Sequence, residues 1–252
     1  MLKKKLKSNI YLKSLFNSLN IKKNDNIVLH SNIAGLYQFE GKIQKKHYIF
    51  FLNFILNFIG KNGTLLVPTY NYDFTKGIPY NRKKTNSQVG AFGNALIKKY
   101  FKLRTFDPIF SHLVFGKLKK EIFSCKHDEA FGEKSVFAKL KKKNFKIICF
   151  CCSTNNITYL HYLEKKFNVK YRFNKIFKVI DKKKKLQISK YYVGKKNYNY
   201  SLKEKNILNI LNNKEFRQAS FGRFKSYSVT VNYLFNKIKD RIHKKNNYLI
   251  SN

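Results

Sequence analysis

The stretch FKIICFCCSTNNITYLHYLEKK, residues 145–166, decides the fold class of this chain. Its first part, residues 145–152, is a continuous apolar run typical of a strand that is buried on both faces. The polar segment 153–156 interrupts this run, and residues 157–166 then carry apolar side chains at helical spacing. A buried strand that leads into a helix favours an α/β fold.

The same alternation of strand and helix runs through the preceding residues. We expect helices over residues 6–19, 46–59, 89–100 and 135–143, and buried strands over residues 27–30, 64–67 and 112–115. Alternating elements of this kind predict a three-layer α/β/α fold with a mostly parallel central sheet. The connections include residues 31–41 and a polar loop over residues 69–88, and a loop as long as the second is usually functional.

Beyond about residue 170 the pattern changes. Strands are expected over residues 171–180, 186–193 and near 214–219, and helices over residues 202–211 and 229–243. The polar run 181–185 between the first two strands predicts a hairpin turn. We therefore expect a catalytic α/β core over residues 1–170 and a smaller α+β part over residues 171–252, both in one continuous domain.

The chain is strongly basic. Its 252 residues include 53 Lys and Arg but 13 Asp and Glu, which gives a net charge of +40. Such a surface attracts polyanions, among them nucleic acids and anionic membranes. Lys, Asn, Ile, Phe and Tyr are all abundant and the lysines are spread along the whole chain, so we favour coding bias as the origin of the charge.

The cysteines and the apolar segments bear on metals and location. Cys149, Cys151 and Cys152 lie inside an apolar run, as small buried thiols do, and paired C-x-x-C spacing is absent, so neither a metal site nor a disulfide framework is expected.

The longest apolar stretch, residues 48–59, is shorter than the roughly 20 residues that span a bilayer. Residues 2–7 precede no apolar signal region, and we expect a cytoplasmic protein.

His161 and Glu164 form the sharpest candidate site. Residues three apart share one face of a helix, and this helix follows a buried strand, where ligands bind in parallel α/β sheets. A histidine suits general-base chemistry on an amine, and a carboxylate can fix its tautomer. Spacing alone nevertheless favours an ordinary helix that happens to carry both residues.

Two further segments are weaker candidates. Residues 29–36 (LHSNIAGL) run from a strand into a Ser- and Gly-containing loop whose backbone N–H groups suit a phosphate or a pantetheine amide. Residues 104–116 (RTFDPIFSHLVFG) contain Arg104, which suits a phosphate, and an Asp-Pro turn before Ser111. A tight turn explains the first segment as well, and a surface arginine the second.

Taken in order, these segments resemble the aminoglycoside 3-N-acetyltransferase family over roughly residues 8–175. The resemblance rests on seven segments: residues 30–35, 63–70, 90–93, 104–116, 131–140, 158–164 and 171–172. It implies an α/β/α fold and transfer of an acetyl group from acetyl-CoA to an amine, without a metal. It also implies that His161 is the general base and Glu164 its acidic partner or a substrate contact.

The same resemblance assigns most of the CoA contacts, and the positive charge of an aminoglycoside suggests acidic acceptor contacts. It implies CoA contacts at His30, Ser31 and Ile33, and others at Ser111 and at Ser135, which with Gly132 matches the G…S pair before a helix. Arg104 joins this set as a candidate phosphate contact. The expected acceptor contacts are Asp73, Asp107 and Thr158, of which Thr158 is also a candidate oxyanion donor.

Some residues depart from the family pattern, and these departures bear on the acceptor. Asp107 stands where antibiotic-modifying members commonly carry His, and Cys151-Cys152 replace a small, Gly-containing strand end. A protein with a net charge of +40 attracts a polycationic aminoglycoside poorly. It attracts anions such as CoA, or an amino sugar carried on a nucleotide diphosphate. We therefore expect an amino sugar, nucleotide-linked and destined for surface polysaccharide, as acceptor.

Other interpretations stay open. The first alternative acceptor is an aminoglycoside antibiotic. An alternative of another class is a basic nucleic-acid-binding protein on an inactive acetyltransferase fold, for which the Lys- and Tyr-containing residues 191–200 are weak support. Intact His161 and Glu164 argue against it, so we expect no specific nucleic-acid partner. A homodimer and peripheral contact with an anionic membrane are both compatible with the enzyme.

Overall fold

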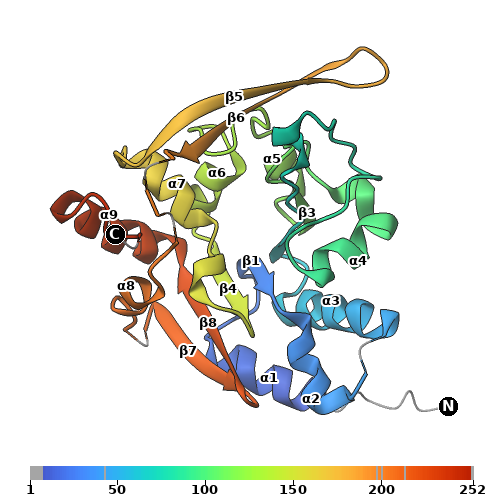
Figure 1. Cartoon of the computed structure of the whole chain (residues 1–252). Helices are drawn as coiled ribbons and strands as arrows, with labels where there is room; N and C mark the ends of the chain where they lie inside the picture. The colour runs from blue at the N-terminus through green and yellow to red at the C-terminus, as the bar shows by residue number, and fades with distance from the viewer. Residues whose placement is uncertain (1–7, 43, 197, 200, 213, 251–252) are drawn as a thin grey trace.

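The computed structural model describes residues 8–42, 44–196, 198–199, 201–212 and 214–250 (Figure 1). Its α-helices are α1 (Ser8–Ser18), α2 (Tyr37–Glu40), α3 (Lys45–Ile59), α4 (Ala91–Tyr100), α5 (Lys119–Phe123), α6 (Val136–Lys142), α7 (Tyr159–Lys166), α8 (Glu204–Leu208) and α9 (Val231–Lys244). The strands are β1 (Asn26–Ser31), β2 (Thr64–Pro68), β3 (His112–Gly116), β4 (Lys146–Phe150), β5 (Arg172–Ile180), β6 (Leu186–Gly194), β7 (Phe216–Phe221) and β8 (Phe224–Thr230). The expected start of the first helix, at residue 6, lies outside the described residues.

One six-stranded sheet forms the centre of the molecule, in the order β3-β2-β1-β4-β8-β7. β1 is parallel to both β2 and β4, whereas β3, β7 and β8 run antiparallel to their neighbours. The sheet is therefore mixed, and the expectation of a mostly parallel sheet was wrong. A short apolar run has the same pattern in a parallel and in an antiparallel strand, and the length of the connection decides the strand direction. The two residues 222–223 between β7 and β8, for example, allow only an antiparallel hairpin.

The C-terminal part contributes two strands to this sheet. β8 pairs directly with β4, so the strand that leads to α7 is flanked on one side by residues beyond 170. The sequence analysis missed β8 and began the last helix at residue 229, but Val229 is a strand residue and α9 begins at Val231. The helix expected over residues 202–211 is limited to α8. One continuous domain stays a prediction, and the shared sheet supports it.

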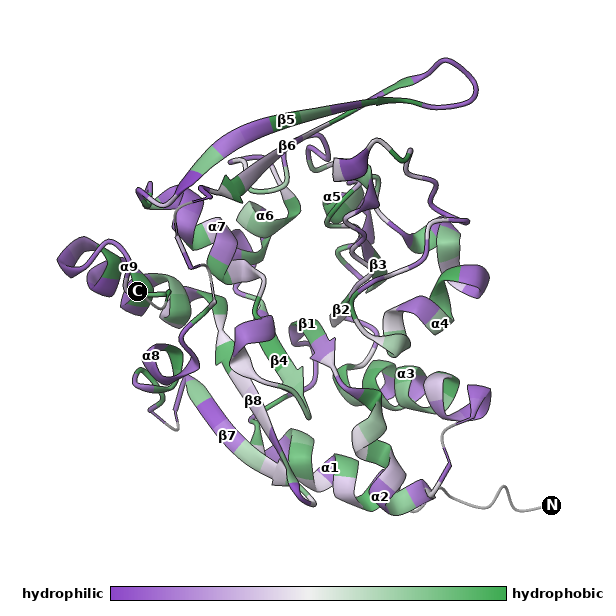
Figure 2. Ribbon diagram, viewed as in Figure 1, coloured by the Kyte–Doolittle hydropathy of each residue, from purple (hydrophilic) through white to green (hydrophobic). Residues whose placement is uncertain are grey.

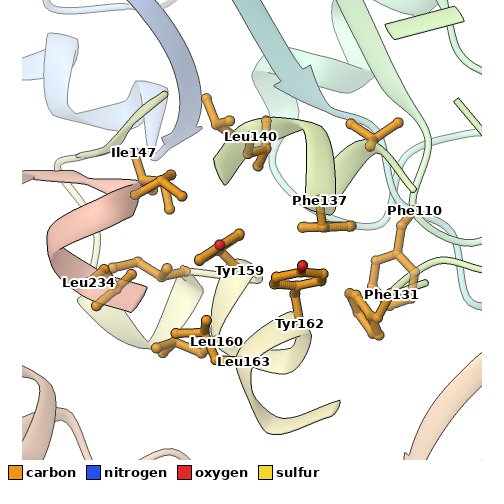
Figure 3. Packing of buried hydrophobic residues seen from close by; sticks show 14 of the residues in the cluster. Phe110, Phe131, Phe137, Leu140, Ile147, Tyr159, Leu160, Tyr162, Leu163 and Leu234 are labelled. Carbon is orange, nitrogen blue, oxygen red and sulfur yellow. The ribbon is translucent and has the colours of Figure 1, made fainter. Parts of the chain in front are cut away.

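Two hydrophobic cores lie on the two faces of the sheet, as the three-layer architecture requires. Side chains alternate along each strand: Ile27 and Leu29 point into one core and Val28 into the other. Helices α1, α3 and α4 cover the first face, and α6, α7 and α9 cover the second. Figure 3 shows Tyr159, Leu160 and Leu163 of α7 packed in this second core. Each large apolar side chain buried in this way contributes roughly 1.5–3 kcal/mol.

β4 ends earlier than the sequence predicts. Its last residue is Phe150, and Cys151 adopts a left-handed backbone conformation with φ 53°. This bend turns the chain out of the sheet toward Ser153, whose side chain caps the short 3₁₀ helix Thr154–Asn156. The three clustered cysteines pack in or against the cores, as expected, and all four cysteines of the chain are free thiols.

The expected loop over residues 31–41 contains two short helices. A 3₁₀ helix spans Ile33–Leu36, capped by the Asn32 side chain, and α2 follows it directly. The described part of the chain contains no helix with the length and apolar character that a membrane span needs.

The expected hairpin is confirmed: β5 and β6 pair antiparallel as a separate two-stranded sheet. It arches over the top of the molecule in Figure 1, from the side of α7 toward α5. Gln187 of β6 exchanges two hydrogen bonds with the backbone of Tyr80, at 2.8 and 2.9 Å. The hairpin is thereby tied to the long loop over residues 69–88.

Candidate active site

Helix α7 holds the central pair of the site. The Nδ1 atom of His161 lies 2.6 Å from Oε2 of Glu164, one helical turn away. The Glu164 side chain is 0% exposed, whereas that of His161 is 21% exposed. Tyr159 and Tyr162 stack on each other on the same helix, with ring centroids 5.2 Å apart, and help to anchor it in the core.

Three neighbours hold the buried carboxylate of Glu164. Besides His161, the hydroxyl of Tyr171 donates to Oε1 at 2.8 Å, and Nε of Arg172 lies 2.7 Å from Oε2. Burial by itself raises the pKa of this carboxyl. The charge and the hydrogen bond of His161 lower this pKa, and so do the charge of Arg172 and the hydrogen bond from Tyr171. Together they outweigh burial, and the pKa of Glu164 lies below its ordinary value. A buried carboxylate is costly unless it is paired in this way.

The pair fixes what His161 can do chemically. A short contact from Nδ1 to an ionised carboxylate assigns the proton of the neutral ring to Nδ1, because a carboxylate only accepts. Nε2 then carries the lone pair and can take a proton. When it does so, Glu164 stabilises the imidazolium. The arrangement suits general-base catalysis.

A cleft of about 550 Å³ lies at the carboxyl ends of β1 and β2. The residues that line it come from the end of β1 and the loop after it, from the end of β2, and from the start of α4. They include His30, Ser31, Ile33, Gly90, Gly93, Cys152 and Asn156. The three expected CoA contacts thus lie together on one wall. Asn156 belongs to the segment that leads into α7, and this places the cleft next to that helix.

A row of buried polar side chains connects the cleft with α7. The hydroxyl of Tyr70 lies 2.8 Å from Nε2 of His112 and faces the side chain of Thr158, the residue before α7. Burial lowers the pKa of His30 to about 4, and burial with the neighbouring charge of His30 lowers that of His112 to about 3. Both rings are neutral at physiological pH. Thr158 is half-buried beside Tyr70, as an acceptor or oxyanion contact requires.

Arg104 and Ser111 have a structural role. Arg104 is 0% exposed, and its guanidinium donates to the carbonyl oxygens of Thr69 and Thr85 and to the Ser111 hydroxyl, at 2.6, 2.5 and 3.0 Å. Ser111 is also 0% exposed and donates to Thr69 O at 2.9 Å. Both fix the base of the long loop over residues 69–88. We therefore leave both out of the CoA contacts proposed below.

Ser135 caps α6 away from the main cleft. Its hydroxyl donates to Gly132 O at 2.6 Å and accepts from Ala138 N at 3.3 Å. Ser135 is 2% exposed, but it contributes to the wall of a second hollow of about 520 Å³ with Phe131 and Lys165. The ring of Phe131 lies 6.2 Å from that of His161, so this hollow adjoins α7 on another side.

The two expected acidic acceptor contacts differ in environment. Asp73 is half-exposed and accepts from Gln88, which lines the cleft, at 3.0 Å. Hydrogen bonds from Gln88 and Asn71 lower its pKa. Asp107 is buried, accepts from the backbone N–H groups of Ile109 and Phe110, and has its pKa raised by burial to about 6. Asp73 is thus available at the rim of the site, whereas Asp107 shapes a turn.

The sequence analysis gave no role to four residues that complete the site. Tyr171 and Arg172 hold Glu164, and Tyr70 faces Thr158. Tyr191 packs on Phe110 with ring centroids 5.1 Å apart and lies near Arg172. The signal for Tyr70, Tyr171 and Arg172 was present, since residues 63–70 and 171–172 belong to the segments that carry the resemblance. Tyr191 had no signal, because only strand pairing brings it to α7.

No three His, Cys, Asp or Glu side chains gather as a metal ion would require within the part of the chain that the structure describes. A reaction without a metal stays a prediction. The fold and the site so far are those of a three-layer α/β protein whose His161–Glu164 pair, on a helix beside a cleft at strand ends, suits general-base chemistry.

Comparisons identify the family. The aminoglycoside 3-N-acetyltransferase family model matches residues 28–243. AAC-IIIb in binary complex with CoASH has a TM-score of 0.74 at 14% identity, covering 92% of this chain and 96% of that one. A mutant of the aminoglycoside acetyltransferase AAC(3)-IVa in complex with a gentamicin has a TM-score of 0.75 at 11% identity, covering 100% and 94%. YokD from Bacillus subtilis has a TM-score of 0.74 at 13% identity, covering 94% and 99%.

A search among curated proteins found no match. The family model covers most of the chain, and the chain belongs to the aminoglycoside 3-N-acetyltransferase family. It is accordingly an N-acetyltransferase of that family, as the resemblance in the sequence predicted.

Proposed function

We propose that the protein transfers the acetyl group of acetyl-CoA directly to an amine of an aminoglycoside-type amino sugar, with His161 as general base. The observation that carries this proposal is the 2.6 Å contact between His161 Nδ1 and the fully buried carboxylate of Glu164. It leaves Nε2 free of the proton and places a negative charge behind the ring.

The proposed reaction proceeds in two steps. The acceptor nitrogen attacks the thioester carbonyl while His161 Nε2 takes its proton, and the tetrahedral intermediate then expels the CoA thiolate. The thiolate leaves with the proton that His161 received, so the enzyme returns to its starting state. The hydroxyl of Thr158 and the backbone N–H groups after His30 are the candidate donors to the oxyanion. Direct transfer needs no cysteine nucleophile.

The cleft at the ends of β1 and β2 is the proposed site of acetyl-CoA. His30, Ser31 and Ile33 line it, and its volume of about 550 Å³ lies within the usual range of cofactor sites. Gly93 lets the first turn of α4 lie close to β2, since a Cβ there would collide with Pro68 O. The CoASH complex of AAC-IIIb, which shares this fold, supports the assignment.

The relatives favour an aminoglycoside as acceptor over the nucleotide-linked amino sugar that the sequence analysis put first. AAC(3)-IVa shares this fold and has been crystallised with a gentamicin. The long loop over residues 69–88 and the β5–β6 hairpin border the site, and Asp73 on that loop suits an ammonium group. The net charge of +40 still favours an anionic acceptor, and a nucleotide-linked amino sugar is the second candidate.

The test is thiol release from acetyl-CoA with gentamicin-type aminoglycosides, UDP-amino sugars and free amino sugars as acceptors. We expect turnover with an aminoglycoside, and its loss by more than about a hundredfold in His161→Ala. CoA binding by calorimetry should remain in this variant, which shows that the fold and the cleft are intact. Turnover that survives in His161→Ala contradicts the mechanism. Turnover with UDP-amino sugars alone selects the second candidate.

A cytoplasmic location, a possible homodimer and the absence of a specific nucleic-acid partner stay predictions.

A further inference from the structure

The outer face of the β5–β6 hairpin is apolar and exposed. Residues directly opposite in an antiparallel pair share a face, and Ile180 pairs with Leu186, Lys178 with Ile188, and Ile176 with Lys190. Ile176, Ile180, Leu186 and Ile188 therefore lie on one face, with exposed fractions of 56%, 66%, 50% and 39%. We call these four residues the aliphatic face. Surface side chains of this size in a contiguous group mark an interaction site.

In the half of the hairpin nearest the turn, the opposite face is directed at the protein. Val179 and Ser189 are buried there, and Gln187 bonds the Tyr80 backbone in both directions. The turn is ordered as well, because the Asp181 carboxylate accepts from the backbone N–H groups of Lys183 and Lys185 at 2.8 and 3.0 Å. The aliphatic face is thus held outward by a defined structure.

Lysines surround the aliphatic face. Between residues 172 and 194 the chain has one acidic residue, Asp181, and seven lysines: Lys175, Lys178, Lys182, Lys183, Lys184, Lys185 and Lys190. The four in the turn are all exposed, and among the ion pairs found in the described residues none involves them. Figure 2 shows the hydrophobic segments along the hairpin and the hydrophilic turn at its end.

This combination selects one class of partner. An anionic bilayer offers phosphate groups to the lysines and acyl chains to the isoleucines at the same surface. Single-stranded nucleic acid needs aromatic rings on which bases stack, and the aliphatic face has none. A second copy of this chain would bring two lysine-rich turns and two charges of +40 together.

We propose that the β5–β6 hairpin docks the protein on an anionic lipid surface. The aliphatic face enters the boundary between headgroups and acyl chains, and Lys182, Lys183, Lys184 and Lys185 contact the lipid phosphates. The hairpin leads the protein onto the membrane because it extends beyond the other elements in Figure 1, at the end opposite to α1 and α2.

Co-sedimentation of the full chain with lipid vesicles tests this proposal. We expect binding to phosphatidylcholine vesicles that contain phosphatidylglycerol and little binding to pure phosphatidylcholine. Replacing the four turn lysines by Gln should weaken binding about tenfold or more, because each basic residue near an anionic surface contributes to the affinity. Ile180→Asp should also weaken it about tenfold or more, through lost apolar insertion and added repulsion.

Two control variants make the same chemical changes at the other end of the molecule. Ile10→Asp alters a side chain on α1 that is 71% exposed, and Lys13, Lys22, Lys23 and Lys61 are exposed lysines whose replacement by Gln removes the same charge. Both controls should bind vesicles almost as the unaltered protein does. Thiol release in solution should be unchanged in all four variants, which shows that each is folded.

Four results overturn the proposal. The first is an Ile180→Asp variant that binds as its Ile10→Asp control does, because charge alone then explains binding. In the second, a single-stranded oligonucleotide displaces the protein from vesicles, and Ile180→Asp weakens oligonucleotide binding as much as it weakens vesicle binding. The aliphatic face then binds nucleic acid. The third is a dimer, without vesicles present, that Ile180→Asp converts to a monomer, because a second copy then covers the face. Absence of any vesicle binding also overturns it.

Discussion

Oε2 of Glu164 lies 2.6 Å from Nδ1 of His161 and 2.7 Å from Nε of Arg172, so one carboxylate oxygen contacts both the His161 ring and a buried cation. Arg172 is 8% exposed and Glu164 is 0% exposed. The second oxygen of Glu164 accepts from Tyr171. The carboxylate therefore orients His161 and compensates Arg172 at the same time, and in the proposed mechanism catalysis and stability depend on the same group.

Glu164→Gln should affect both properties. Without the negative charge, the imidazolium that forms during transfer loses its stabilisation, and we expect kcat to fall about a hundredfold or more. Arg172 is left buried without its carboxylate, so the free energy of unfolding should fall by roughly 3 kcal/mol. KM for acetyl-CoA should change little, since Glu164 is not among the residues that line the cleft. Steady-state kinetics and urea unfolding measure these effects.

The matched control is Glu133→Gln, which makes the same chemical change at a side chain that is 84% exposed. It should alter neither kcat nor the unfolding midpoint. A Glu164→Gln variant with unaltered kcat would show that His161 works without its carboxylate.

Gly35→Ala should disturb the wall of the proposed CoA site. A Cβ at Gly35 would collide with Sγ of Cys151 and lie 2.9 Å from its Cβ. Overpacking of this kind costs roughly 2 kcal/mol, and Kd for CoA, measured by calorimetry, should rise because residues 31–34 line the cleft.

Cys151→Gly removes both colliding atoms and suits the φ of 53° at that position. The double variant Gly35→Ala/Cys151→Gly should therefore be more stable than the sum of the single effects predicts, as a double-mutant cycle measures. Strict additivity would show that the two residues do not interact.

Arg104→Lys distinguishes a structural role of Arg104 from a role as a contact to the phosphates of CoA. A single ammonium cannot reach the oxygens that the guanidinium joins at Thr69, Thr85 and Ser111, and we expect a loss of roughly 3 kcal/mol in unfolding free energy. Kd for CoA, measured below the unfolding transition, should stay near the unaltered value. The exposed Arg223→Lys is the control for the substitution itself. A large rise in Kd with little loss of stability would return Arg104 to the CoA contacts.

Asp107→Asn tests a pH dependence. Burial raises the pKa of Asp107 from 3.8 to about 6, so the folded protein holds this proton more tightly than the unfolded chain does. The contribution of Asp107 to stability is therefore full below pH 3.8 and is lost as pH rises to about 6. The Asn variant keeps an Oδ1 for the Ile109 and Phe110 N–H groups but does not titrate.

Relative to the unaltered protein, Asp107→Asn should gain roughly 3 kcal/mol of unfolding free energy between about pH 4 and pH 7. Urea unfolding at the two pH values measures this gain. A difference between the two proteins that does not depend on pH would place the pKa of Asp107 near its ordinary value.

Local pattern sufficed for much of the fold. The periodicity of residues 157–166 predicted α7, and the apolar runs at residues 27–30 and 64–67 predicted β1 and β2 within one or two residues. Local pattern could not predict strand direction, because an apolar run of five residues is the same in a parallel or an antiparallel pair. β8 was missed because its apolar residues continue into α9, and only pairing with β4 separates the two elements.

The sequence by itself determined that His161 and Glu164 meet, because three residues along a helix always place two side chains on one face. It also brought His30, Ser31 and Ile33 together, since they lie at the end of one buried strand and directly after it. Only the tertiary structure decided that Tyr171 and Arg172 hold Glu164 and that Arg104 is an internal anchor. The physical reason is that burial and charge compensation arise between segments that chain folding brings together, and spacing along the chain does not record them.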